Sequence, residues 1–143
     1  MSANCTVYDV EVAPPCEVVK TWTSSELYNK VIEAGLGSAS MMWRDYEYRE
    51  ATRESIEAFI KWDDTDQLRR TGFFDCDDFA LIFDANIHKW CPGIAAGQIY
   101  YQNGARHAVN IIFMDGDFFL LDPEKDKMIN PIERYGMIYW FLF

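Results

Sequence analysis

A thiol, an imidazole and a carboxylate follow one another along the second half of the chain, at Cys76, His107 and Asp122. These groups can act together in nucleophilic catalysis, in which the imidazole takes the thiol proton and the carboxylate orients the imidazole. Cys76 opens a predicted helix, where free backbone N–H groups and the helix dipole stabilise a thiolate and can bind an oxyanion. We therefore predict Cys76 as nucleophile, His107 as base and Asp122 as the orienting acid.

The position of Asp122 depends on a predicted hairpin. Asp115-Gly116 separates two apolar, β-prone runs, which is a strong signal for a tight turn between antiparallel strands. Pairing across this turn sets Asp117 near Met114 and brings Asp122 opposite Val109 or Ala108. Asp122 is then expected within a residue or two of His107.

The elements that must position these groups fall into two halves. Helical periodicity and start or stop residues predict helices over residues 24–34, 46–62 and 76–90. Four apolar runs then follow, and they are separated by turn signals; they predict strands over residues 97–101, 108–114, 118–121 and 137–143. A weaker alternation over residues 6–12 suggests a short edge strand. Helices first and strands second predict an α+β fold, with N-terminal helices packed on a C-terminal antiparallel β-sheet.

The ordered motifs resemble a known superfamily. Cys-Asp-Asp-Phe-Ala begins at Cys76, His-Ala follows 31 residues later, and Leu-Asp-Pro places its acid 15 residues after that. This set resembles the transglutaminase-like branch of the papain-like fold, including bacterial transglutaminase-like cysteine proteinases. It resembles still more the protease domain at the C-terminus of certain fungal agglutinins, although the acid there is Glu. The resemblance covers roughly residues 70 to 130 and implies a Cys-His-acid triad at Cys76, His107 and Asp122.

Two further expectations come from this resemblance. Papain-like enzymes often place a Gln shortly before the nucleophile as an oxyanion donor, whereas Arg70 stands six residues before Cys76 here. Gln67, nine residues before, is our choice for that role. The fungal agglutinin proteases depend on calcium, so calcium is the one cofactor considered, although no EF-hand ligand order is present. We otherwise expect no cofactor and no bound metal.

Composition limits the partners and the compartment. The chain has 143 residues, which fits a single domain over residues 1–143, and its formal net charge of -10 disfavours nucleic acid and anionic membranes. No signal peptide or membrane-spanning run is evident, and the longest apolar stretch is far shorter than a spanning helix needs. The four cysteines show no CxxC pair and no dense spacing, which argues against a zinc site and a disulfide scaffold. Without a signal peptide, reduced thiols and a cytoplasmic location are expected.

The sequence therefore predicts a thiol hydrolase, a cysteine peptidase or amidase that acts on a protein or peptide through an acyl-thioester on Cys76. Transfer of the acyl group to an amine, as in transglutaminases, is one alternative. A non-catalytic binding protein that retains the fold is the other.

Overall fold

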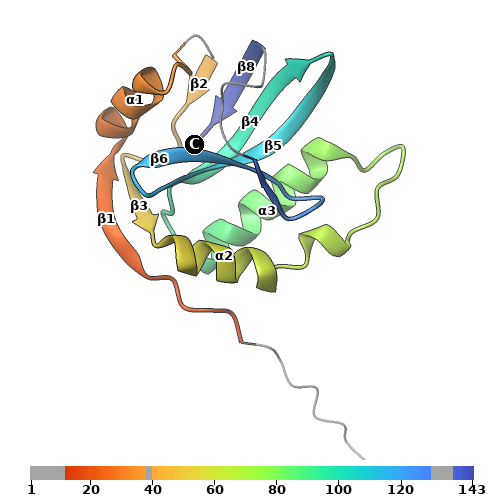
Figure 1. Cartoon of the computed structure of the whole chain (residues 1–143), viewed down its shortest axis with the longest axis horizontal. Coiled ribbons are helices and arrows are strands. Elements are labelled where there is room, and N and C mark those ends of the chain that lie inside the picture. The colour runs from red at the N-terminus through yellow and green to blue at the C-terminus, as the bar shows by residue number, and fades with distance from the viewer. Residues whose placement is uncertain (1–11, 38–39, 130–136) are drawn as a thin grey trace, which may run out of the picture.

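The computed structural model describes residues 12–37, 40–129 and 137–143. Its helices are α1 (Ser24–Glu33), α2 (Arg53–Trp62) and α3 (Cys76–Trp90), with a 3₁₀ turn, η1, at Thr65–Gln67. Its strands are β1 (Val18–Thr23), β2 (Ser40–Met42), β3 (Glu47–Ala51), β4 (Ala96–Asn103), β5 (Ala105–Met114), β6 (Asp117–Asp122), β7 (Lys127–Ile129) and β8 (Met137–Leu142). Strands outweigh helices in the described residues (Figure 1). The strand predicted over residues 6–12 falls almost wholly outside them.

The strands form two sheets, which corrects the predicted fold class. The larger sheet has the order β2-β8-β4-β5-β6-β7, and β1 pairs with β3 in a separate two-stranded sheet. The strand β2 comes from the N-terminal half and runs parallel to β8, so the large sheet is mixed rather than antiparallel. The predicted layout of N-terminal helices on a C-terminal antiparallel sheet is therefore wrong. The three N-terminal strands were missed because each is short and is stabilised by partners distant in sequence.

The hairpin that carries the predicted base and acid is confirmed. β5 and β6 pair across Asp115-Gly116 with Met114 opposite Asp117 and Asn110 opposite Leu121. Asp115 and Gly116 both have positive φ, which a two-residue hairpin turn of this hand requires. One further step along the ladder sets Asp122 opposite Val109, as the sequence predicted.

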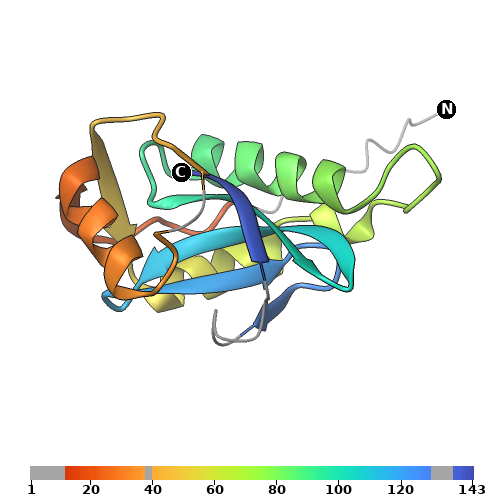
Figure 2. The same ribbon diagram turned by 90° about the horizontal axis from the view of Figure 1, so that it is seen from above.

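The large sheet is covered on both faces. Alternate residues of β5 point to opposite sides, so Val109 and Ile111 join a core with Leu27 and Val31 of α1. Ile112 lies instead in a second core, together with side chains of α2 and α3, such as Ile56, Phe59, Phe83 and Ile87. Figure 2 shows α3 running along one side of this sheet. The helix that begins at Cys76 is therefore held firmly against β4 and β5.

Of the three predicted helices, α3 is confirmed with both of its ends, and α1 is confirmed as a helix. Its N-cap is Thr23, whereas the sequence pointed to Ser24 or Ser25. The helix predicted over residues 46–62 is wrong in its first part. Residues 47–51 form β3, and the Thr52 side chain accepts a hydrogen bond from Ser55 N–H to start α2. Within β3, Tyr48 and Glu50 are buried while their neighbour Arg49 is exposed, which is the period of a strand. The helical spacing of apolar residues across this boundary was coincidental.

Cys16 and Cys91 form a disulfide, with their Cα atoms 6.0 Å apart. It ties the segment before β1 to the C-terminal end of α3. The expectation of reduced thiols is therefore wrong for Cys16 and Cys91. That expectation was the basis for predicting a cytoplasmic location, and disulfides persist mainly in oxidising compartments. Across the described residues, no helix has the length and apolar character needed to cross a bilayer.

Candidate functional site

Cys76 is the first residue of α3, and the local sequence fixes the start of that helix. Asp75 precedes it in an extended conformation, and the Asp75 N–H donates a 3.0 Å hydrogen bond to the Asp78 carboxylate. Such a reciprocal cap stabilises the first turn of a helix. The loop before it is tied across the site, since Arg70 donates two 2.8 Å hydrogen bonds to the Glu124 carboxylate. Arg70, six residues before Cys76, thus makes a structural ion pair.

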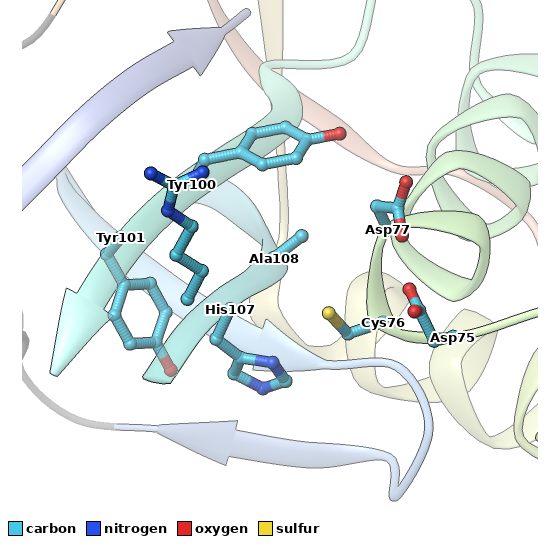
Figure 3. A pocket seen from close by; sticks show the side chains of 8 residues that line it. Asp75, Cys76, Asp77, Tyr100, Tyr101, His107 and Ala108 are labelled. Carbon is cyan, nitrogen blue, oxygen red and sulfur yellow. The ribbon is translucent and has the colours of Figure 1, made fainter. Parts of the chain in front are cut away.

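The thiol opens into a cavity of about 520 Å³ between the start of α3 and the strands β4 and β5. Figure 3 shows the sulfur and the His107 imidazole approaching this space from opposite sides. A second hollow of about 490 Å³ continues past the same residues toward Arg70. The first cavity is lined by Asp75, Cys76, Asp77, Tyr100, Tyr101, Arg106, His107 and Ala108. Its volume lies in the range of small-molecule sites, ~300–1,000 Å³.

His107 is half-buried near the start of β5 and stands opposite Tyr101 of β4. The two rings meet edge-to-face with centroids 5.6 Å apart, which fixes the plane of the imidazole. Burial lowers the pKa of His107, the Asp122 carboxylate opposes that shift, and Lys125 and Arg70 add to it. Because the net shift is downward from 6.5, the imidazole is mainly neutral at pH 7.

Asp122 is buried at the end of β6. One carboxylate oxygen accepts a 3.1 Å hydrogen bond from Glu124 N–H, and the other accepts a 3.2 Å bond from Lys125 Nζ. Within the described residues no hydrogen bond joins Asp122 to His107, and none joins His107 to Cys76. The three predicted groups are thus gathered in one region, without the two hydrogen bonds that would link them as a relay.

Gln67 is not brought to the cavity. It ends the 3₁₀ turn η1, is exposed, and donates a 2.7 Å hydrogen bond to the neighbouring Asp66 carboxylate. It is absent from the residues that line either hollow beside Cys76. Its predicted role as an oxyanion donor therefore gains no geometric support.

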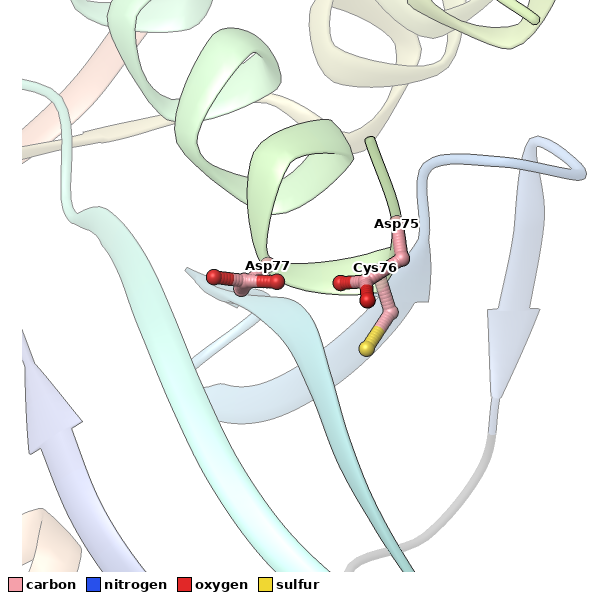
Figure 4. Close-up of side chains that lie close together, drawn as sticks. All are labelled: Asp75, Cys76 and Asp77. Carbon is pink, nitrogen blue, oxygen red and sulfur yellow. The ribbon is translucent and has the colours of Figure 1, made fainter. Parts of the chain in front are cut away.

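Two carboxylates flank the thiol, as Figure 4 shows. The interaction between the Asp75 and Asp77 side chains lowers the pKa of Asp75 and raises that of Asp77. Ligand atoms of Asp75, Cys76 and Asp77 lie within 4.8 Å of one another. Calcium takes about six to eight oxygen ligands, and two carboxylates beside a sulfur do not fit that demand. The calcium expectation has no support from this cluster.

Sequence reasoning missed Tyr100 as a wall of the cavity. Its hydroxyl donates a 3.3 Å hydrogen bond to Gln98 Oε1, and Gln98 Nε2 donates a 3.0 Å bond to the buried Asp84 of α3. Asp84 also accepts two hydrogen bonds from Arg44, at 2.6 and 3.0 Å. This network ties the cavity wall to α3. The only signal of this network in the sequence was Asp84, a carboxylate on the apolar face of the helix that begins at Cys76.

Asn110 was also missed in this role, although it stands three residues after His107. Its side-chain amide is buried and donates hydrogen bonds to Ala80 O of α3 at 2.9 Å and to Gly97 O of β4 at 3.1 Å. These bonds fix the distance between the first turns of α3 and the strand that carries His107. Asn110 therefore positions the two sides of the cavity relative to each other.

No protein-family model matches the chain, and no match is found among curated proteins. A similar solved structure is described as the PSL1a–E64 complex, at 21% identity and a TM-score of 0.74, covering 86% of this chain and 50% of that one. Another is the lectin of Polyporus squamosus bound to the human-type influenza-binding epitope Neu5Acα2-6Galβ1-4GlcNAc, at 20% identity and a TM-score of 0.72, covering 86% and 49%. The chain spans about half the length of each. At this identity the likeness shows a shared fold alone.

These comparisons correct the family and the activity predicted from the sequence. The similar structures are described as a lectin and its complexes with bound ligands. They are not described as papain-like or transglutaminase-like cysteine proteases. The assignment as a cysteine peptidase acting on protein or peptide is corrected accordingly. The physical reason is that an ordered Cys, His and acid show what a site contains, whereas a function depends on how those groups are linked.

Proposed function

We propose that this chain is a ligand-binding domain whose principal site is the cavity at the start of α3, with Cys76, His107 and Asp122 as site residues. The observation that carries the proposal is the cavity of about 520 Å³, in which a thiol meets an imidazole between tyrosine walls. Mostly apolar walls with a few convergent polar groups are typical of small-molecule sites. Tyr100, Tyr101 and Ala108 supply the apolar surface, while Asp75 and Arg106 supply the charges.

Binding without turnover is favoured by the hydrogen bonds that Asp122 makes. A relay needs Cys76 to give its proton to His107 and Asp122 to hold the other ring nitrogen. Neither hydrogen bond is present among the described residues. Asp122 instead accepts from the backbone of Glu124 and from Lys125. The carboxylate is thus engaged in closing the turn after β6.

The ligand class we infer is a small, extended molecule that places an electrophilic carbon beside the Cys76 sulfur. One similar structure is described as a complex with E64, which is an epoxide, and epoxides react with thiols. Within the described chain Cys76 is the cysteine outside a disulfide, and it is partly accessible. In such a reaction the sulfur bonds to an epoxide carbon, the carbon–oxygen bond breaks, and the alkoxide takes the thiol proton. The protein is consumed once and is not regenerated.

Intact mass spectrometry after incubation with E64 tests the site. We expect one adduct per chain, mapped to Cys76, and none in Cys76→Ser. Asp122→Asn is expected to slow the modification, because the Asp122 charge supports the protonated form of His107 that would pair with a thiolate at Cys76. Glu124→Gln, which breaks the ion pair to Arg70, serves as the matched control. An adduct spread over several residues, or none, would refute the proposed site.

Turnover is tested separately with casein and with a fluorogenic peptide substrate. We expect no hydrolysis above that of Cys76→Ser over hours. Sustained hydrolysis that disappears in Cys76→Ser and after E64 treatment would overturn the non-catalytic function while leaving the site itself in place.

A further inference from the structure

A second cavity, of about 610 Å³, lies between the end of α2 and the second half of α3. It is lined by Ala13, Trp62, Asp63, Asp64, Asn86, Lys89 and Trp90, and shares no lining residue with the cavity at Cys76. Asn86 stands ten residues after Cys76 on α3, which corresponds to about 15 Å along the helix. The two cavities are therefore separate sites on one helix.

Two tryptophans form fixed walls of this cavity. Trp90 stacks on Phe59, with centroids 4.6 Å apart, and its indole N–H donates a 2.5 Å hydrogen bond to Pro14 O. Trp62 packs against the same Phe59 at 5.9 Å and still leaves 38% of its surface exposed. A large aromatic ring that is exposed yet held in place offers contact area at a low entropic cost.

The polar groups between the tryptophans are also held in place. Asp63 is buried, and its carboxylate accepts a 2.7 Å hydrogen bond from Asn86 Nδ2 and a 3.1 Å bond from Thr65 N–H. In the part of the chain that the structure describes, the side chains of Asp64 and Lys89 make no hydrogen bond or ion pair. The cavity thus combines a rigid amide–carboxylate pair with one acceptor and one donor that are available at its rim.

We propose that this cavity binds a neutral saccharide. A sugar ring presents an apolar C–H face that packs on an exposed aromatic ring, and hydroxyls that both donate and accept hydrogen bonds. Trp62 supplies the ring, Asp64 an acceptor and Lys89 a donor. Two carboxylates against one ammonium leave the cavity net negative, so an anionic sugar of the same size is disfavoured.

Saturation-transfer NMR on the full chain tests this inference, with lactose, maltose and N-acetylglucosamine as probes and glucuronic acid as the charged comparison. We expect transfer to the ring C–H protons of at least one neutral sugar, and weaker transfer to glucuronic acid. Trp62→Ala is expected to weaken binding at least about tenfold, as truncation of an aromatic anchor does. Phe73→Ala removes another exposed aromatic side chain, from outside the cavity, and is expected to change nothing.

The test of sugar binding can be distinguished from the test of E64 modification at Cys76. Protein already modified by E64 is expected to bind the neutral sugar with unchanged affinity, because the two cavities share no lining residue. Absence of transfer from every neutral probe, or equal binding by wild type and a folded Trp62→Ala variant, would overturn the inference. Loss of sugar binding on E64 modification would assign the sugar to the Cys76 cavity and would refute a separate site.

Discussion

His107 and Asp122 lie on the same face of the large sheet, on the neighbouring strands β5 and β6, yet they share no hydrogen bond within the described structure. The ladder ends with Asn110 opposite Leu121, and its continuation by one residue sets Asp122 opposite Val109, diagonal to His107. Diagonal neighbours across a sheet are about 7–8 Å apart, a separation at which charge still acts. The effect of Asp122 on His107 is therefore electrostatic.

Replacing Asp122 by Asn should lower the pKa of His107 further. The Asp122 charge is the largest influence that opposes the effect of burial, whereas Glu124 contributes less in the same direction. NMR titration of the His107 ring protons in Asp122→Asn and in Glu124→Gln measures both effects. A larger drop in Glu124→Gln, or no change in Asp122→Asn, would contradict this electrostatic assignment.

Acid should remove the stabilisation contributed by Asp84. Burial alone would raise the pKa of Asp84, but hydrogen bonds from His88, Arg44 and Gln98 outweigh it and lower the pKa to about 2 from 3.8. Because the folded pKa is the lower one, this stabilisation is complete above 3.8 and is lost as the pH falls toward 2. The difference corresponds to about 2 kcal/mol of unfolding free energy.

Urea unfolding at a series of pH values checks this expectation. The gap in unfolding free energy between wild type and Asp84→Asn should narrow by about 2 kcal/mol between pH ~5 and pH ~2. Parallel curves for the two proteins over that range would show that Asp84 is not a source of the acid sensitivity.

Reduction of the Cys16–Cys91 disulfide should destabilise the fold. The bridge closes a loop with a sequence separation of 75 residues, and such a cross-link typically contributes about 2–4 kcal/mol by restricting the unfolded chain. A reducing agent should lower the Tm of wild type and of Cys76→Ser equally. The reducing agent should leave the Tm of a Cys16→Ser/Cys91→Ser double variant unchanged. An equal fall in the Tm of that variant would refute the assignment of the stabilisation to this disulfide.

Gly97→Ala should destabilise the sheet, whereas Gly72→Ala should not. A Cβ on Gly97 would lie 1.8 Å from the carbonyl oxygen of Leu142 in β8, while one on Gly72 meets nothing within 4 Å. Strand β4 must shift from β8 to accept the methyl group, at a cost of about 1–3 kcal/mol. Thermal unfolding of both variants measures the difference, and comparable stability would show that the β4–β8 contact adjusts freely.

The sequence by itself determined the local features: the helix beginning at Cys76, the hairpin at Asp115-Gly116 and the approach of Asp122 toward His107. These follow from caps, turn residues and strand alternation, which act over a few residues. The tertiary structure alone decided that β2 joins β8, that Cys16 reaches Cys91, and that Gln67 stays away from the cavity. It also decided that Asp122 binds Lys125 rather than His107. Such pairings depend on packing between segments distant in the chain, and no local pattern records which of two nearby partners a carboxylate will bind.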